Sequence, residues 1–225
     1  MRPLILGDGL LGSELIKQTK WDFLSRKSHN FDIKNFSDFI KDEYDIIINC
    51  IANTNTYSEE MDSHWNVNVQ FVNELIDYCN DKNIKLVHIS TDYVYTGSDI
   101  NANENTVPVH CNTWYGYTKL VSDAIVQLRS NNYLLIRCTQ KPTPFPYEKA
   151  WIDQIGNFDY VDVISDLIIK SVKKNLSGLY NLGTETKTMF ELASRTSNVS
   201  KSFSPVSVPK NTSMNVTKLL TDLNE

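Results

Sequence analysis

The chain of 225 residues lacks several features that would assign it to a common functional class. It has no run of lysine or arginine, and 22 basic against 27 acidic residues give a net charge of -5, which argues against a general nucleic-acid binder. Its four cysteines, Cys50, Cys79, Cys111 and Cys138, form no CxxC pair and have no Cys/His spacing suited to zinc. We therefore expect no metal site, but reduced and mostly buried thiols in a cytoplasmic protein.

Long apolar runs are also missing. None approaches the length of a membrane span, and Met1-Arg2-Pro3 leads directly into a short apolar stretch, so neither a membrane segment nor a signal peptide is expected.

Glycine is scarce, with eight residues, yet Gly7, Gly9 and Gly12 fall within the first twelve positions. They lie between an apolar run and a segment with helical periodicity, the strand–turn–helix context of a dinucleotide-binding loop. We expect Gly7 to permit the tight turn, Gly9 to let the backbone approach a pyrophosphate, and Gly12 to allow close helix–strand packing. The predicted cofactor-binding loop comprises Gly7, Asp8, Gly9, Leu10, Leu11 and Gly12.

Tyr115 and Lys119 stand four residues apart in a segment with helical periodicity. Residues at that spacing share a helix face, so the ammonium can lie beside the phenol, favour the phenolate and lower the tyrosine pKa. Such a tyrosine can pass a proton to a carbonyl oxygen while a hydride reaches the carbon. Together with the glycine loop, this pair predicts a nicotinamide-dependent oxidoreductase.

Ser90 and Thr91 follow an apolar strand, so their hydroxyls are expected at the carboxyl edge, where doubly wound sheets bind ligands. A hydroxyl there can donate to the same carbonyl oxygen that Tyr115 protonates. Strand-end capping is the alternative role for such residues.

The segment after the second strand distinguishes between the two nicotinamide cofactors. An acidic residue there would bind the adenosine ribose, whereas a basic residue would accommodate a 2′-phosphate. Ser25, Arg26 and Lys27 occupy that place and favour NADP, with NAD as the alternative. A solvated loop that happens to be basic is the other interpretation.

Apolar strands and helical segments alternate along the chain, which predicts a Rossmann-type α/β fold: a doubly wound parallel sheet with a small C-terminal substrate lobe. We expect residues 1–141 to form the NADP-binding domain and residues 142–225 a small substrate-binding region packed on it as one compact unit. The Pro-rich stretch 141–147 should cross the surface near the site. The expected strands are 3–6, 21–24, 45–49, 85–89, 133–137 and 179–182, and the expected helices are 10–18, 36–41, 63–80, 115–128, 163–173 and 189–195.

Five motifs occur in a fixed order: the glycine loop, Ile-Asn-Cys-Ile-Ala at 48–52, Val-Asn at 67–68, Ser-Thr-Asp-Tyr-Val-Tyr at 90–95 and Tyr-Gly-Tyr-Thr-Lys at 115–119. In these the chain resembles the extended short-chain dehydrogenases/reductases. The motif at 90–95 followed by Gly97, and the closing segment 209–219, most resemble dTDP-4-dehydrorhamnose reductase and related nucleotide-sugar enzymes.

The resemblance implies Thr91 as a hydroxyl donor, Tyr115 as the acid, and Lys119 as the residue that binds the nicotinamide ribose and tunes the tyrosine. It implies NADPH as cofactor, a nucleotide-sugar substrate and, as a possible assembly, a homodimer. A structural role for Asn68 is equally consistent. The implied cofactor-binding residues beyond the loops above are Asn49, Cys50, Ile51, Ala52, Asn68, Tyr115 and Lys119, and the implied substrate-binding residues are Asp92, Tyr93 and Arg137.

The leading hypothesis is an NADPH-dependent reductase of a nucleotide-linked 4-keto-deoxysugar. An epimerase or dehydratase of the same superfamily is the alternative enzyme. Dehydratases commonly place Asp-Glu after the threonine, where this chain has Asp92-Tyr93, and His110-Cys111 does not match the added acid/base pair of epimerases. A non-catalytic NADP-binding subunit is the alternative outside enzymes, because the segment after Arg137 is shorter than in the family.

Overall fold

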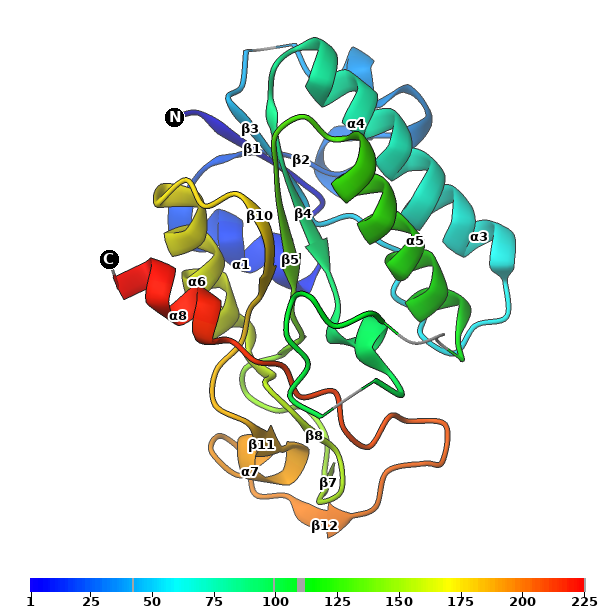
Figure 1. Ribbon diagram of the computed structural model, residues 1–225, viewed down its shortest axis with the longest axis vertical. Coiled ribbons are helices and arrows are strands. Elements are labelled where there is room, and N and C mark those ends of the chain that lie inside the picture. The colour runs from blue at the N-terminus through cyan, green and yellow to red at the C-terminus, as the bar shows by residue number, and fades with distance from the viewer. Residues whose placement is uncertain (42, 99, 109–111, 225) are drawn as a thin grey trace.

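A six-stranded parallel sheet in the order β10-β5-β4-β3-β1-β2 forms the centre of the protein (Figure 1). The computed structural model describes residues 1–41, 43–98, 100–108 and 112–224. The predicted Rossmann-type sheet is confirmed. Its strands are β1 Pro3–Leu6, β2 Asp22–Leu24, β3 Ile46–Asn49, β4 Lys85–Ser90, β5 Tyr133–Arg137 and β10 Gly178–Asn181.

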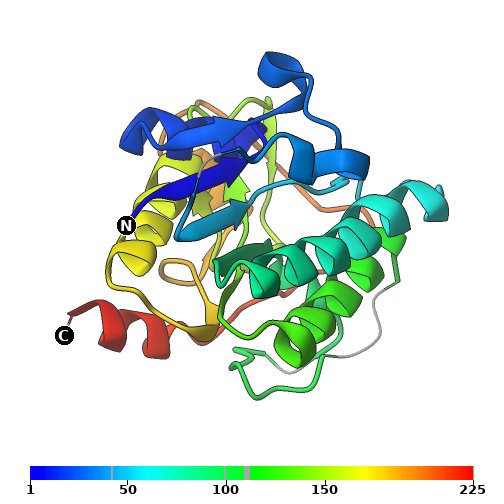
Figure 2. The same cartoon turned by 90° about the horizontal axis from the view of Figure 1, so that it is seen from above.

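Helices cover both faces of this sheet (Figures 1 and 2). Because successive strand residues point to opposite faces, Ile5 packs with the core under α1, α6 and α8, whereas Leu4 and Leu6 pack with the core under α4 and α5. Two covered faces explain why the strands are continuously apolar. The helices are α1 Leu10–Thr19, α2 Arg26–His29, the 3-10 helix η1 Ile33–Asp38, α3 Met61–Trp65, the π-helix η2 Asn66–Gln70, α4 Phe71–Asp81, the 3-10 helix η3 Asp92–Tyr95, α5 Trp114–Arg129, α6 Val161–Lys173, α7 Met189–Ala193 and α8 Thr217–Asn224.

A small lobe lies beyond the carboxyl ends of the central strands, at the bottom of Figure 1. It is built on three short strand pairs, β11-β8, β12-β7 and β6-β9, around a small apolar core that includes Phe158 and Leu192. The sequence did not predict these strands. They are β6 Gln140–Lys141, β7 Lys149–Trp151, β8 Ile155–Gly156, β9 Asp159–Tyr160, β11 Lys187–Thr188 and β12 Ser200–Ser202.

The chain after residue 142 contributes to both parts of the molecule. Its α6, β10 and α8 belong to the sheet and its covering helices, while β7 to β9, β11, α7 and β12 build the lobe. Residues 142–225 therefore contribute to the central sheet and its covering helices as well as to the lobe. No helix within the described ranges is long and apolar enough to cross a membrane.

The strand order changes direction between β1 and β3, and ligands of doubly wound sheets bind at such a switch point. The glycine loop leaves β1 here, with Gly7 N donating to Leu24 O at 2.8 Å. The segment after β3 lies beside it, with Cys50 N donating to Leu6 O at 3.0 Å. The fold thus brings the predicted cofactor segments to one edge of the sheet.

Candidate functional site

The glycine loop has the shape that a dinucleotide requires. Gly7 has φ +96, a conformation that favours glycine, and a Cβ on Gly12 would lie 2.0 Å from Gly7 O. A Cβ on Gly9 would meet nothing within 4 Å, so the backbone there is open to a ligand. Gly9 begins α1 without a side-chain cap, which leaves N–H groups of the first turn for an anion. Leu11 packs into the core, so the loop can offer a cofactor mainly its backbone.

Arg26 and Lys27 lie in the first turn of α2, directly after β2, and both are exposed. Ser25 is buried, and its Oγ accepts from Ser28 N at 3.1 Å as the helix cap. The cap folds this segment into one helical turn, which the sequence did not predict.

Two buried asparagines hold the segment that follows β3. Asn49 Oδ1 accepts from Ile51 N at 3.1 Å, and Asn68 bonds both the N–H and the carbonyl of Asn53. Asn68 also donates to Thr118 Oγ1 at 3.0 Å, which ties this segment to α5. Both amides fix the shape of this segment beside the glycine loop. Its residues Cys50, Ile51 and Ala52, which were expected to bind the cofactor, are half-buried.

Asn68 lies in η2, the π-helical turn that interrupts the single helix expected at 63–80. Such turns are rare and are frequent at functional sites.

Thr91 and Tyr115 lie beside each other at the carboxyl edge of the sheet. Burial raises the pKa of Tyr115 above its ordinary value; the Thr91 side chain opposes the shift, and the charge of Asp92 adds to it. The phenol is therefore held in its acid form.

Lys119 is buried and bonded to β4, not to the phenol. Its Nζ donates to Ile89 O at 2.7 Å and lies 3.2 Å from His88 Nε2. The expected lowering of the Tyr115 pKa by this ammonium is wrong for this structure, because its hydrogen bonds go to β4. Burial lowers the pKa of Lys119 to about 8, although the charge of Asp123 opposes the shift.

His88 links Lys119 to the cofactor segment. Its Nδ1 lies 3.3 Å from Asn49 Nδ2, and burial, followed by the charge of Lys119, lowers its pKa well below the ordinary value. A neutral imidazole has one acceptor nitrogen, so it accepts from the lysine or from the amide, but not from both. Sequence reasoning did not place His88 among the expected site residues. Its place on the same face of β4 as Ser90 was the signal that could have found it.

Asp92 and Arg137 were expected to bind substrate, and the structure gives both other partners. Arg137 is 2% exposed, and its Nε donates to Asp123 Oδ2 at 2.9 Å while its Nη1 donates to Tyr95 at 2.6 Å. Asp92 is 1% exposed and accepts from threonine hydroxyls on both carboxylate oxygens. Both side chains are therefore engaged inside the protein, and a direct contact of either with substrate stays a prediction.

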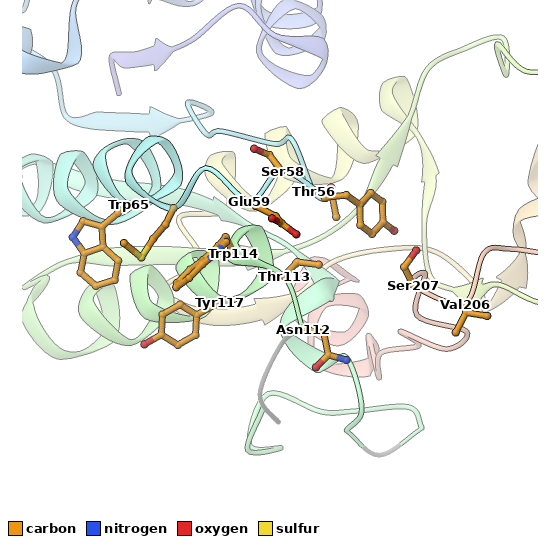
Figure 3. Close-up of a pocket in the computed structure, with 12 residues that line it drawn as sticks. Thr56, Ser58, Glu59, Trp65, Asn112, Thr113, Trp114, Tyr117, Val206 and Ser207 are labelled. Carbon is orange, nitrogen blue, oxygen red and sulfur yellow. The ribbon is translucent and has the colours of Figure 1, made fainter.

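Tyr93 lies beside Tyr115, and its expected contact with substrate stays a prediction. Its ring packs edge-on against Tyr115 with centroids 6.1 Å apart, and its hydroxyl lies 3.4 Å from that of Tyr57. Tyr57 in turn lines a cavity of about 1070 Å³ between the segment after β3, the start of α5 and a lobe loop. Figure 3 shows the loop with Val206 and Ser207 approaching the loop with Thr56 and Ser58.

The cavity walls are aromatic and polar. Trp65, Trp114 and Tyr117 contribute rings, and Glu59 is the only charged side chain among the twelve described residues that line it. A diphosphate in this cavity would therefore have to be held by hydroxyls and backbone amides.

Several neighbours of the site were not predicted. Lys141 in β6 is half-buried; burial lowers its pKa, and the charge of Asp92 opposes that shift. Its place in a Pro-rich stretch gave no signal. His110 and Cys111, weighed as an acid/base pair, lie outside the described residues. No group of three or more His, Cys, Asp or Glu side chains that could hold a metal occurs within the described ranges.

Comparisons with known proteins agree with this geometry. The pattern of the RmlD substrate binding domain family matches residues 1–140. A dTDP-4-dehydrorhamnose reductase of Aggregatibacter actinomycetemcomitans is 27% identical over 180 residues, which are 74% of this chain and 61% of the relative. The chain thus spans about three fifths of the length of the curated relative it matches.

Solved structures show the same fold across nearly the whole chain. The dTDP-4-dehydrorhamnose reductase of Bacillus anthracis in complex with NADP is 23% identical with a TM-score of 0.83, covering 98% of this chain and 92% of that one. The hypothetical dTDP-4-dehydrorhamnose reductase of Sulfolobus tokodaii is 22% identical with a TM-score of 0.80 over 98% and 94%. The UDP-glucuronic acid 4-epimerase of Bacillus cereus in complex with NAD is 18% identical with a TM-score of 0.78 over 100% and 90%.

Proposed function

The chain belongs to the RmlD substrate binding domain family, and from that premise we propose that it is an NADPH-dependent reductase of a nucleotide-linked 4-keto-deoxysugar. The observation that carries the proposal is the placement of Thr91 beside Tyr115 at the carboxyl edge of the sheet, the edge at which the open glycine loop also lies. A curated relative named dTDP-4-dehydrorhamnose reductase supports the sugar. The expected cytoplasmic location and possible homodimer belong to the same proposal.

Tyr115 gives its proton to the carbonyl oxygen of the substrate, and Thr91 donates a hydrogen bond to the same oxygen. A raised tyrosine pKa keeps the phenol protonated at neutral pH, which suits ketone reduction and disfavours the reverse oxidation. Lys119, which is buried against β4, binds the nicotinamide ribose. Bound NADPH would supply the hydride.

The residues present fit a dinucleotide. The open backbone at Gly9 and the uncapped start of α1 suit the pyrophosphate, and the exposed Arg26 and Lys27 suit a 2′-phosphate. The segment from Cys50 to Ala52 would complete the wall beside the nicotinamide half.

Removal of the two cations after β2 is expected to abolish cofactor selectivity. The unmodified protein should bind NADPH more tightly than NADH. The R26A/K27A variant should bind NADPH roughly tenfold more weakly. This is the lower end of the loss expected for charge-assisted hydrogen bonds, because both side chains are exposed. Fluorescence titration measures the dissociation constants for NADPH and NADH. K173A/K174A at the far end of α6 removes the same charge and serves as control. Equal affinities for the two cofactors in the unmodified protein would refute the assignment.

NADPH affinity is expected to fall as pH rises through about 8. Lys119, with its pKa lowered to about 8, carries its charge below that pH and loses it above. Loss of the ammonium removes a charge-assisted bond to the ribose, so the dissociation constant should rise about tenfold between roughly pH 7 and pH 9. K119M should remove the dependence and Y115F should keep it. A flat profile in the unmodified protein would contradict the role of Lys119.

Turnover on a panel of 4-keto nucleotide sugars, followed by loss of NADPH absorbance, tests the activity. We expect consumption of NADPH with at least one member. Tight NADPH binding without turnover of any member would favour a non-catalytic subunit instead.

A further inference from the structure

Asp92 follows Thr91 directly and is a buried carboxylate with no free oxygen. Its Oδ2 accepts from Thr212 Oγ1 at 2.7 Å, and its Oδ1 accepts from Thr139 Oγ1. Thr91 Oγ1 also points to Oδ1, but at 3.3 Å. Three hydroxyls, one from the preceding residue and two from distant segments, therefore converge on one carboxylate beside the acid of the proposed reaction.

Thr212 is held in place by its own backbone. Its N–H donates to Ile155 O at 3.0 Å. The next two residues are also hydrogen-bonded: Ser213 Oγ accepts from Asn101 N at 2.9 Å. Met214 N donates to Asn157 Oδ1 at 2.7 Å. The side chain of Thr212 is 2% exposed. The closing segment of the chain thus presents a fixed hydroxyl to Asp92.

A threonine hydroxyl has one proton to donate. The Thr91 oxygen accepts from Tyr93 N at 3.2 Å, and its proton can go to Asp92 or to a hydroxyl or carbonyl beside Tyr115. Thr139 already occupies Oδ1 with the closer contact, so Asp92 competes weakly for the Thr91 proton. Without Thr139, the unfilled Oδ1 would draw that proton inward, because an unsatisfied buried carboxylate oxygen is costly.

We propose that Asp92 is an internal anchor, and that Thr139 and Thr212 are positioning residues that saturate it so that the Thr91 proton stays available to the substrate oxygen. This inference rests on the proposed reductase function. The proposal gives the segment with Thr212 a role beyond substrate contact: this segment keeps the Thr91 hydroxyl available as a hydrogen-bond donor.

Valine variants of the two threonines test the anchor, because valine keeps the branched shape and removes the hydroxyl. T139V and T212V should each lower kcat by about tenfold or more, a fraction of the 10²- to 10³-fold typical for losing one such donor. KM and the NADPH dissociation constant should stay within about twofold. T139S and T212S restore the hydroxyl and should restore turnover. T184V, which removes a hydroxyl from the buried Asp159 in the lobe, is the matched control and should leave kcat unchanged.

The decisive comparison combines T139V with T91V. If Thr139 acts through Thr91, the double variant should be no slower than T91V alone, whereas a separate structural role would make the two losses multiply. Multiplying losses, or a loss in T184V equal to that in T139V, would overturn the proposal while the reductase assignment stands.

A crystal structure of T139V gives a readout without turnover. The Thr91 Oγ1 to Asp92 Oδ1 distance should shorten from 3.3 Å to an ordinary hydroxyl–carboxylate bond. An unchanged distance would overturn the anchor. If the unmodified protein reduced no keto-sugar while the T139V structure showed this shortening, the proposed function alone would be overturned.

Discussion

Tyr115→Phe should lower kcat by about 10²- to 10⁴-fold, the usual contribution of a positioned general acid. The phenol is the proposed proton donor beside Thr91, and its raised pKa keeps the proton in place at neutral pH. NADPH affinity should change little, because the variant leaves the glycine loop, α2, the segment from Cys50 to Ala52 and Lys119 unchanged. Steady-state turnover and NADPH fluorescence separate the two effects.

Tyr78→Phe is the matched control for that variant. Tyr78 lies on α4, where its ring packs edge-on against Phe36 away from the cleft. The Tyr78→Phe variant also loses a tyrosine hydroxyl, but at a different place, and should keep full turnover. A Tyr115→Phe protein that reduced the substrate at the unmodified rate would show that another group supplies the proton.

Asp123→Asn should reduce the free energy of unfolding by about 3–5 kcal/mol, the typical result of breaking a buried ion pair from one side. Asp123 and Arg137 are almost completely buried, and Arg137 Nε donates to the carboxylate at 2.9 Å. The variant leaves the guanidinium charge inside the fold. Since the free energy of unfolding of a domain is about 5–15 kcal/mol, the Asp123→Asn variant should be close to unfolding at room temperature. Urea denaturation measures the change.

Asp166→Asn removes the carboxylate from an exposed pair with Lys170 on α6 and should cost about 0–1 kcal/mol. Equal losses in the two variants would mean that Arg137 finds another partner or water once Asp123 is neutral.

The sheet could be predicted because its strands are apolar on both faces. β5 was predicted to the residue at 133–137, and the glycine loop was located by its strand–turn–helix context. These elements depend on local sequence: a continuous apolar run, a helical stripe and a turn that needs glycine. The assignment to the family required the same motifs.

The lobe could not be predicted for a physical reason. β8 and β9 are two residues long, too short to show a period, and each pairs with a strand far along the chain or across a proline-rich stretch. α8 was not among the expected helices, because Leu219 is the one buried residue among those described in this helix, which leaves little helical periodicity to recognise.

The hydrogen-bond partners of the charged groups in the site could not be predicted from the sequence either. Helical spacing placed Tyr115 and Lys119 on one face, but the spacing does not say that Ile89 O and His88 hold the ammonium. Nor does it say that Asp92 turns inward to Thr212, since that contact joins residues 120 positions apart. Direct partners of a charged group decide its pKa and role, and these come from the tertiary fold.

Transfer of deuterium from NADPH labelled at the nicotinamide C4 to a 4-keto nucleotide sugar tests the central claim most directly. With the label on the transferred face, mass spectrometry and NMR should find one deuterium on the reduced sugar carbon, with one NADPH consumed for each product formed. A product without deuterium, or turnover that leaves the NADPH pool unchanged, would contradict the reductase assignment and favour an epimerase that recycles its hydride.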